Sequence, residues 1–243
     1  MQIPEIGPKT ALFLDFDGTL VEIAETPTRV VVPPDLPALL SQLRDLLGGA
    51  VAIVSGRPLL DTDRLLAPFS GASSGEHGAA IRHVDGTLDE VRSEIAVPKE
   101  WKQVLAEETG QLSGVILELK PHGVTLHYRL APDRKDDVWR IARSLVSDDN
   151  PWFHLIPARM AVEIGVKATT KGRAVEKLMA RPPFTGRVPL FIGDDFADEA
   201  GMAAARRLGG QGLRVGEVFG GEPAAVRAWL QDGVERLNHQ VMA

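Results

Sequence analysis

The stretch LFLDFDGTLVE (residues 12–22) places an apolar run directly before two aspartates, Asp15 and Asp17. Two further stretches, AVAIVSGR (50–57) and VPLFIGDD (188–195), share this design of an apolar run followed by polar residues. Uninterrupted apolar runs are typical of parallel strands that helices cover on both faces. The three stretches therefore predict strands of one parallel sheet.

Helical patterns occur between and after these strands. The segment PPDLPALLSQLRDLLGG (33–49) carries leucines at helical spacing and ends in two glycines. It joins the first two strands as a βαβ unit, which predicts a doubly wound, mostly parallel α/β sheet with right-handed crossovers. Further helices are expected at 169–182, with Thr169 or Thr170 as N-cap, and at 196–210.

The middle of the chain has a different pattern. Two helical segments each precede a pair of short strand candidates, and this αββαββ order describes a two-layer α+β unit with an antiparallel sheet. We expect a core of residues 1–96 and 168–243, an insertion at 97–167, and an Asp-Gly hairpin at 79–91. The expected elements of the insertion are helices at 98–110 and 131–149 and strands within 114–130, 152–156 and 159–165.

Composition narrows the class of protein. The chain has 243 residues, 44% of them apolar, a formal net charge of −6 and no cysteine. The absence of cysteine excludes disulfides, thiolate metal sites and cysteine nucleophiles, and the acidic balance argues against nucleic acid or an anionic membrane as the main partner. The N-terminus does not resemble a signal peptide, and no apolar run approaches the ~20 residues that span a bilayer. We expect a monomeric cytoplasmic protein with a small-molecule partner, no nucleic acid and no membrane.

Polar residues follow each predicted strand. In open α/β sheets, ligands bind outside the carboxyl ends of the strands. Several carboxylates on one rim require a counter-charge, and Mg²⁺, which prefers oxygen ligands, is a simple source of it. Lys171, at the start of a helix, and the Ser55 hydroxyl would then complete a phosphate pocket. The residues expected at this rim are Asp15, Asp17, Ser55, Gly56, Arg57, Asp194, Asp195 and Asp198.

The two aspartates of the first strand can divide the chemistry of phosphate ester hydrolysis. Asp15 can attack phosphorus and form an aspartyl-phosphate, while Asp17 can protonate the leaving alcohol and later deprotonate water. Each residue also has an ordinary structural interpretation. Asp-Gly favours a plain turn, Asp194 and its neighbour are good helix N-caps, and Lys171 alone would be a surface lysine.

The motifs DFDGT, VSGR, TKG and GDDFADE, in this order, resemble those of the haloacid dehalogenase (HAD) superfamily of phosphatases. The resemblance implies a HAD-like core in which Asp15 is the nucleophile and Asp17 the acid and base. It implies phosphate binding by Ser55, Gly56 and Lys171. It also implies a Mg²⁺ site made by Asp15, Asp17 through its backbone carbonyl, Asp194 and Asp198.

A narrower resemblance covers nearly the whole chain. The stretches GEHGAAIR, LELKPHGVTLHYR, AVEIG and IGDDFADEAGM are similar to the trehalose-6-phosphate phosphatase family. This narrower resemblance implies that residues 97–167 form a mobile cap that recognises the sugar. The family usually continues the late EI of the cap with Lys-Pro, whereas this chain has Gly165-Val166, with Lys167 as a candidate replacement. The implied substrate contacts are Arg57, His77, Glu118, Lys120, Arg129 and Glu163; we leave His122 and His127 out.

The leading hypothesis is a Mg²⁺-dependent phosphatase of trehalose biosynthesis that hydrolyses trehalose 6-phosphate. A phosphatase of another sugar phosphate, such as sucrose 6-phosphate or mannosyl-3-phosphoglycerate, is the alternative within the same core chemistry. A sugar-phosphate sensor without catalysis is disfavoured, because a sensor needs neither a nucleophile nor a proton shuttle. A phosphomutase is disfavoured because no feature suggests that a sugar intermediate is held and reoriented. Without the resemblance, Glu118, Lys120 and Arg129 would be read as the solvated face of a sheet.

Overall fold

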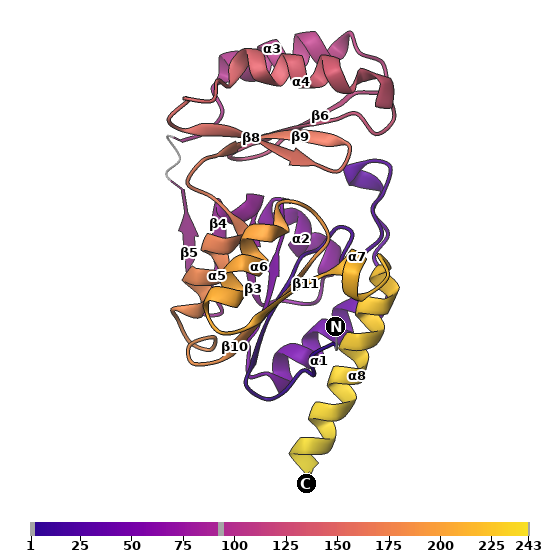
Figure 1. Ribbon diagram of the computed structural model, residues 1–243, viewed down its shortest axis with the longest axis vertical. Helices are drawn as coiled ribbons and strands as arrows, with labels where there is room; N and C mark the ends of the chain where they lie inside the picture. Colours follow the sequence, from indigo (N-terminus) through magenta and orange to yellow (C-terminus); the bar gives the residue numbers. More distant parts are fainter. Residues whose placement is uncertain (1–2, 92–94, 243) are drawn as a thin grey trace.

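The computed structural model describes residues 3–91 and 95–242, without the side chains of the last two of these. Figure 1 shows two layered units, a larger one that contains both termini and a smaller one stacked on it. The larger unit contains a seven-stranded sheet in the order β11-β10-β1-β2-β3-β4-β5. Its strands are β1 (Thr10–Leu14), β2 (Val51–Val54), β3 (Ala72–Gly75), β4 (Ala80–Arg82), β5 (Leu88–Glu90), β10 (Val188–Gly193) and β11 (Gln211–Arg214).

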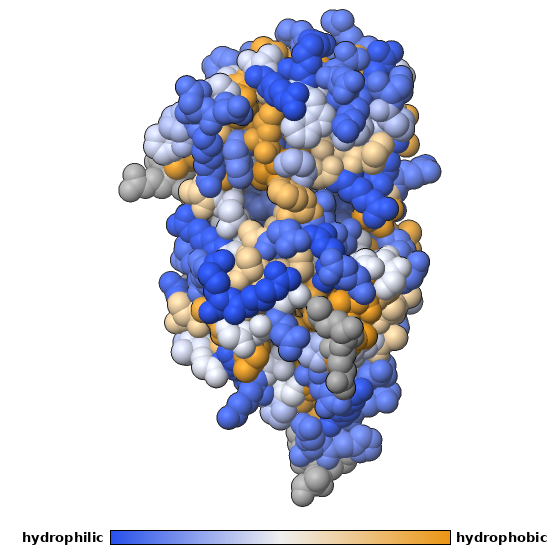
Figure 2. All heavy atoms as spheres, in the orientation of Figure 1, coloured by the Kyte–Doolittle hydropathy of each residue, from blue (hydrophilic) through white to orange (hydrophobic). Residues whose placement is uncertain are grey.

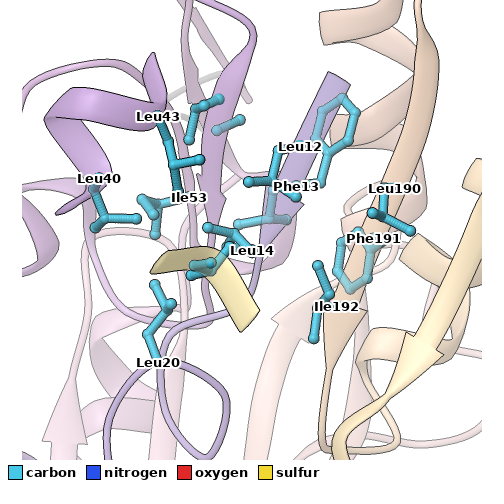
Figure 3. Packing of buried hydrophobic residues seen from close by; sticks show 14 of the residues in the cluster. Leu12, Phe13, Leu14, Leu20, Leu40, Leu43, Ile53, Leu190, Phe191 and Ile192 are labelled. Atoms are coloured by element: carbon cyan, nitrogen blue, oxygen red, sulfur yellow. The ribbon is translucent and has the colours of Figure 1, made fainter. Parts of the chain in front are cut away.

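Strand β1 lies near the middle of this sheet, parallel to β10 on one side and β2 on the other. All five of its residues are buried, as the apolar run predicted. Leu14 is in register with Ile53 of β2 and with Ile192 of β10, and these side chains pack together in the core shown in Figure 3. Because the three parallel strands end at the same level, the polar residues that follow them meet at one edge.

Helices cover both faces of the sheet. Helices α5 and α6 pack against each other beside β10, and α1 packs against α8 (Figure 1). The predicted helices at 33–49, 169–182 and 196–210 are confirmed as α1, α5 and α6, and Thr170 caps α5 by accepting the Arg173 N–H at 3.1 Å. The bounds are α1 (Leu36–Leu46), α2 (Leu59–Leu66), α5 (Lys171–Met179), α6 (Asp198–Arg207), α7 (Val215–Val218) and α8 (Pro223–Met242).

The smaller unit has a four-stranded antiparallel sheet in the order β6-β7-β9-β8. Helices α3 and α4 cover its outer face, and its other face is turned toward the larger unit (Figure 1). The unit has an apolar cluster of its own, and its αββαββ order is the predicted one. The bounds are α3 (Lys99–Gly110), β6 (Ile116–Leu119), β7 (Val124–His127), α4 (Lys135–Leu145), β8 (Phe153–Ala158) and β9 (Ala161–Val166).

The hairpin predicted at 79–91 is confirmed as the antiparallel pair β4 and β5. The segment 92–94, next to the predicted boundary at 96/97, lies outside the described residues, and the domain boundaries stay a prediction. Strands β3 and β11 and helices α2, α7 and α8 were not predicted; β3 reads ASSG and carries no apolar run.

Hydrophilic side chains predominate on the face shown in Figure 2. Among the described helices, none combines the length and the apolarity needed to span a bilayer.

Candidate active site

Three carboxylates and one ammonium group meet at the carboxyl edge of the large sheet. Asp15 follows β1, Asp194 follows β10, Asp198 opens α6 and Lys171 opens α5. One oxygen from each of the three carboxylates lies within 4.8 Å of the others. The Lys171 Nζ donates to Asp15 Oδ1 and to Asp198 Oδ1, each at 2.6 Å. The helix starts and strand ends therefore produce a compact, buried ionic cluster.

The cluster carries more negative than positive charge. Burial, together with the charges of Asp198 and Asp194, raises the pKa of Asp15 well above its ordinary value. Burial and the neighbouring carboxylates of Asp198 and Asp195 raise the pKa of Asp194 to about 7. Burial alone would lower the pKa of Lys171, but the charges of Asp15 and Asp198 raise it above its ordinary range. Three oxygen donors with one lysine are thus a fitting donor set for a hard divalent cation.

Small residues allow the carboxylates to approach. Gly18 has φ +80°, and a β-carbon there would overlap the Asp194 carboxylate. The Thr19 hydroxyl donates to Asp15 Oδ2 at 3.0 Å. Asp194 and Asp195 do not cap α6, which corrects that structural alternative: instead Asp198 Oδ2 accepts their backbone N–H groups at 3.1 and 3.0 Å. This arrangement holds the strand end and the first turn of α6 together.

Asp17 is paired with an arginine. Arg57 donates from Nε to Asp17 Oδ2 at 2.6 Å and from Nη2 to Asp17 Oδ1 at 2.9 Å. Its Nη1 donates to the Pro27 carbonyl at 2.9 Å, and the guanidinium lies over the Phe16 ring. Both oxygens of Asp17 are thus bound by Arg57, a bidentate geometry that fixes a carboxylate firmly. The sequence predicted Arg57 as a substrate contact, whereas here its donors bind the protein itself.

The loop that follows β2 is held through its backbone carbonyls. The Ser55 carbonyl accepts the His77 N–H, and the Arg57 carbonyl accepts the Glu76 N–H, each at 3.0 Å. The Ser55 hydroxyl oxygen accepts the Arg57 N–H at 3.1 Å. Gly56 lies so close to the His77 imidazole that a β-carbon would meet it at 2.7 Å. These bonds fix the backbone of the loop close to the His77 ring.

Charged side chains line the face of the small sheet that is turned toward this edge. Glu118 of β6 is in register with Thr125 of β7, which is in register with Glu163 of β9. Glu163 Oε2 accepts from Lys120 Nζ at 2.6 Å and from Thr125 Oγ1 at 3.0 Å, and its Oε2 lies 3.4 Å from His77 Nε2. The polar positions of neighbouring strands thus form one hydrogen-bonded network.

The charges of this network are paired. Burial would raise the pKa of Glu163, but Lys120 and His77 hold it well below its ordinary value. Burial would lower the pKa of Lys120, but Glu163 and Glu118 raise it. His127 Nε2 lies 2.7 Å from Glu118 Oε2. Each carboxylate of this network thus has a basic side chain within hydrogen-bonding distance, Lys120 for Glu163 and His127 for Glu118.

Apart from Lys167, the residues predicted for the site line one pocket between the two units. Some further residues line the same pocket and were not predicted, among them Thr125, His127 and Arg159. Thr125 and His127 lie on the same sheet face as Glu163, a signal that strand alternation could have provided. Arg159 lies in the turn between β8 and β9, where no periodic pattern marks it. The residues that the structure brings together as predicted are Asp15, Asp17, Ser55, Gly56, Arg57, His77, Glu118, Lys120, Arg129, Glu163, Lys171, Asp194, Asp195 and Asp198.

The position of Lys167 differs from the expectation. Its Nζ donates to the Asp148 carbonyl at 3.1 Å on the exposed side of the unit, and it does not line the pocket. A β-carbon at Gly165 would overlap Ile156 closely, at 2.6 Å from its Cδ1. Gly165 thus leaves room for the Ile156 side chain of the neighbouring strand β8. Lys167 does not take the place of the lysine usual in the family.

The profile of the trehalose-phosphatase family matches residues 13–221. The chain belongs to this family. A probable trehalose-phosphate phosphatase of Sinorhizobium fredii is 41% identical over 88% of this chain and 83% of its own length. The trehalose-6-phosphate phosphatase of Escherichia coli is 36% identical over 88% and 80%. The enzyme class and the family predicted from the motifs are therefore confirmed.

The fold agrees with the family. A solved C-terminal domain of trehalose-6-phosphate phosphatase from C. albicans superimposes with a TM-score of 0.78, at 17% identity, over 94% of this chain and 92% of that one. At this identity the likeness shows the fold. The doubly wound HAD-like core with an inserted αββαββ unit is therefore confirmed as the fold class of this chain.

Proposed function

We propose that this chain is a Mg²⁺-dependent phosphatase that hydrolyses trehalose 6-phosphate to trehalose and phosphate. The observation that carries the proposal is the shared pocket, in which a surplus of buried carboxylates faces a sheet of paired, hydrogen-bonding side chains. The first part suits a phosphate with its cation, and the second suits a sugar rich in hydroxyl groups. The names of the relatives at 41% and 36% identity support the choice of sugar.

The proposed reaction has two steps. Asp15 attacks phosphorus, its oxygen forms a bond to the phosphoryl group, and the bond to the sugar oxygen breaks. Asp17 gives a proton to the leaving oxygen, then takes one from the water that hydrolyses the aspartyl-phosphate. Because Arg57 binds both oxygens of Asp17 here, one of these bonds must be exchanged for the leaving group.

The other residues of the core would position and neutralise the phosphoryl group. Lys171, the Ser55 hydroxyl and the Gly56 backbone N–H would supply contacts to its oxygens. Mg²⁺, held by Asp15, Asp194 and the Asp17 carbonyl with Asp198 in support, would neutralise the charge of the transferring group when bound. These assignments extend the motif-based prediction, and the charge surplus of the cluster supports them.

We propose that residues 97–167 act as the cap. The side chains that would bind the sugar come from β6 and β9, from the residues that follow β6 and β7, and from the segment after β3. Carboxylates, ammonium groups and imidazoles that already hydrogen-bond each other can exchange those bonds for sugar hydroxyls. The proposed sugar contacts are His77, Glu118, Lys120, Arg129 and Glu163, which all line the pocket.

A panel of phosphorylated sugars tests the proposal. Phosphate release would be measured with trehalose 6-phosphate, sucrose 6-phosphate and mannosyl-3-phosphoglycerate at equal concentration, each with Mg²⁺ and with a chelator. We expect the highest kcat/KM for trehalose 6-phosphate, activity only with the metal, and none for Asp15→Asn. A strong preference for another sugar would replace the substrate. Tight binding without turnover on any substrate would favour the sensor.

A further inference from the structure

The segment between β3 and β4 has an uncommon backbone. Glu76 has φ 47° and His77 φ 57°, followed by Gly78 at φ 105°. Left-handed backbone is unfavourable for residues with a β-carbon, and it persists where surrounding contacts fix it. The Glu76 side chain, moreover, is a carboxylate with only 4% exposure. A strained and buried glutamate requires specific partners.

The partners of Glu76 belong to the cap. Its Oε2 accepts the backbone N–H groups of His122 at 2.8 Å and of Gly123 at 3.1 Å, and its Oε1 lies 2.9 Å from His122 Nδ1. These residues form the turn between β6 and β7. Hydrogen bonds to a buried charged acceptor are stronger than those between neutral groups. Glu76 therefore holds one end of the cap sheet against the core, outside the chemistry proposed for the pocket.

The same contacts bear on the phosphate loop. Three consecutive carbonyls of residues 55–57 are each bound: the first by the His77 N–H, the third by the Glu76 N–H, each at 3.0 Å, and the middle one, of Gly56, by Lys120 Nζ at 2.9 Å. Lys120 comes from the cap, directly before the turn that Glu76 binds. Docking of the turn thus places the Lys120 ammonium group against the Gly56 carbonyl, in the middle of the loop.

We propose that Glu76 is a positioning residue that couples docking of the cap to the geometry of the phosphate loop. When the turn is docked, Lys120 reaches the Gly56 carbonyl and completes the set of bonds that orients the loop. When the turn is released, Lys120 leaves with it. The inference rests on the proposed function, because it takes residues 55–57 as the loop that binds the phosphoryl group. A sugar phosphate bound to both units opposes release, whereas a phosphate ester without a sugar does not.

The kinetic test compares Glu76→Ala and Glu76→Gln with wild type on trehalose 6-phosphate and on p-nitrophenyl phosphate. With the sugar substrate, we expect Glu76→Ala to raise KM roughly tenfold or more with little change in kcat, because bound sugar restores docking. With the aryl ester, kcat itself should fall. Glu76→Gln keeps an acceptor for the two N–H groups and should restore most of the wild-type KM. Glu235→Ala, which removes an exposed glutamate of α8, is the control.

A distance measurement keeps the test independent of activity. Because the chain has no cysteine, Glu107→Cys on α3 and Gln231→Cys on α8 can carry a specific pair of spin labels. We expect one narrow distance distribution in the Glu76 protein and a broader, longer one with Glu76→Ala, restored by Glu76→Gln.

The outcomes separate the inference from the proposed function. An equal loss of kcat on both substrates with unchanged distances would show a local role in folding the loop and overturn the coupling. Unchanged kcat on the aryl ester despite longer distances would also overturn it, because the loop would then work without the docked cap. If wild type hydrolyses neither substrate, the proposed function fails, and unchanged distances in Glu76→Ala would overturn the docking by themselves.

Discussion

Replacing Lys171 by methionine removes the cation from a buried cluster. Its Nζ bonds two carboxylates, and the side chains of Lys171, Asp15 and Asp198 are 4%, 6% and 0% exposed. Methionine has nearly the length of lysine and fills the same space without the charge. The folded variant must then either keep its carboxylates ionised without a partner or bind a proton, and either response lowers the free energy of unfolding.

The loss in the free energy of unfolding is set by the response that costs less free energy, which is proton uptake by a carboxylate. Keeping one carboxyl protonated at pH 7, about three units above its ordinary pKa, costs about 4 kcal/mol. This agrees with the 3–5 kcal/mol typical of breaking a buried ion pair. Without the ammonium group the carboxyl pKa values rise further than in wild type, so the folded variant binds more protons than folded wild type. Its stability therefore falls more steeply than that of wild type as the pH rises. The deficit should therefore shrink to about 2 kcal/mol at pH 5.5.

Urea unfolding of metal-free wild type and Lys171→Met, followed by circular dichroism at pH 5.5 and 7, measures both values. Lys177→Met is the matched control, because Lys177 lies on the same helix but pairs with Asp89 near the surface, with a side chain 36% exposed. Its loss should stay within about 1 kcal/mol. A Lys171→Met deficit below about 1 kcal/mol at pH 7, or one that does not depend on pH, would refute the charge argument.

Three further predictions concern single positions. Gly18→Ala should lower kcat by about a hundredfold or more, measured by phosphate release, because its β-carbon would displace the Asp194 carboxylate. Gly172→Ala should lower the thermal midpoint by several degrees in calorimetry, since its β-carbon would lie 2.5 Å from the Ala200 carbonyl of α6. Burial would raise the pKa of Glu163, but Lys120 keeps it below its ordinary value of 4.5. The Glu163 carboxylate therefore contributes its full stabilisation at pH values above this ordinary pKa. The stabilities of wild type and Glu163→Gln in urea should converge as the pH falls below that value.

Much of the core could be predicted from the sequence because its signals are local. An apolar run that ends in aspartates marks both a buried strand and the rim where its neighbours end, and β1 and β10 fulfil this. Strand β3 was not predicted because its residues, Ala72 to Gly75, are small and two of the four are serines, although all four are buried. Burial in that case is decided by what packs around the strand, which a local pattern does not record.

Partners of side chains far apart in the chain could not be predicted. Asp17 and Arg57 are 40 positions apart, and Glu76 and His122 are 46 apart. Asp17 and Arg57 were predicted at the rim, whereas Glu76 was not predicted and His122 was left out. No spacing rule says which carboxylate an arginine or an imidazole will bind. The resemblance implied that Arg57 is a substrate contact, and no local pattern marked Asp17 as its partner.

The two units differ in how their buried carboxylates are compensated, and this difference indicates which part of the substrate each unit would bind. In the core cluster, Lys171 bonds Asp15 and Asp198, and Asp194 adds a third carboxylate. Negative charge is therefore left over, and burial together with this charge raises the pKa values of Asp15 and Asp194. In the cap, Glu163 has Lys120 as a partner and its pKa falls. A cation with its phosphate therefore gains most at the core edge, where charge is unbalanced. An uncharged sugar suits the cap, where hydrogen bonds can be exchanged without exposing an unpaired ion.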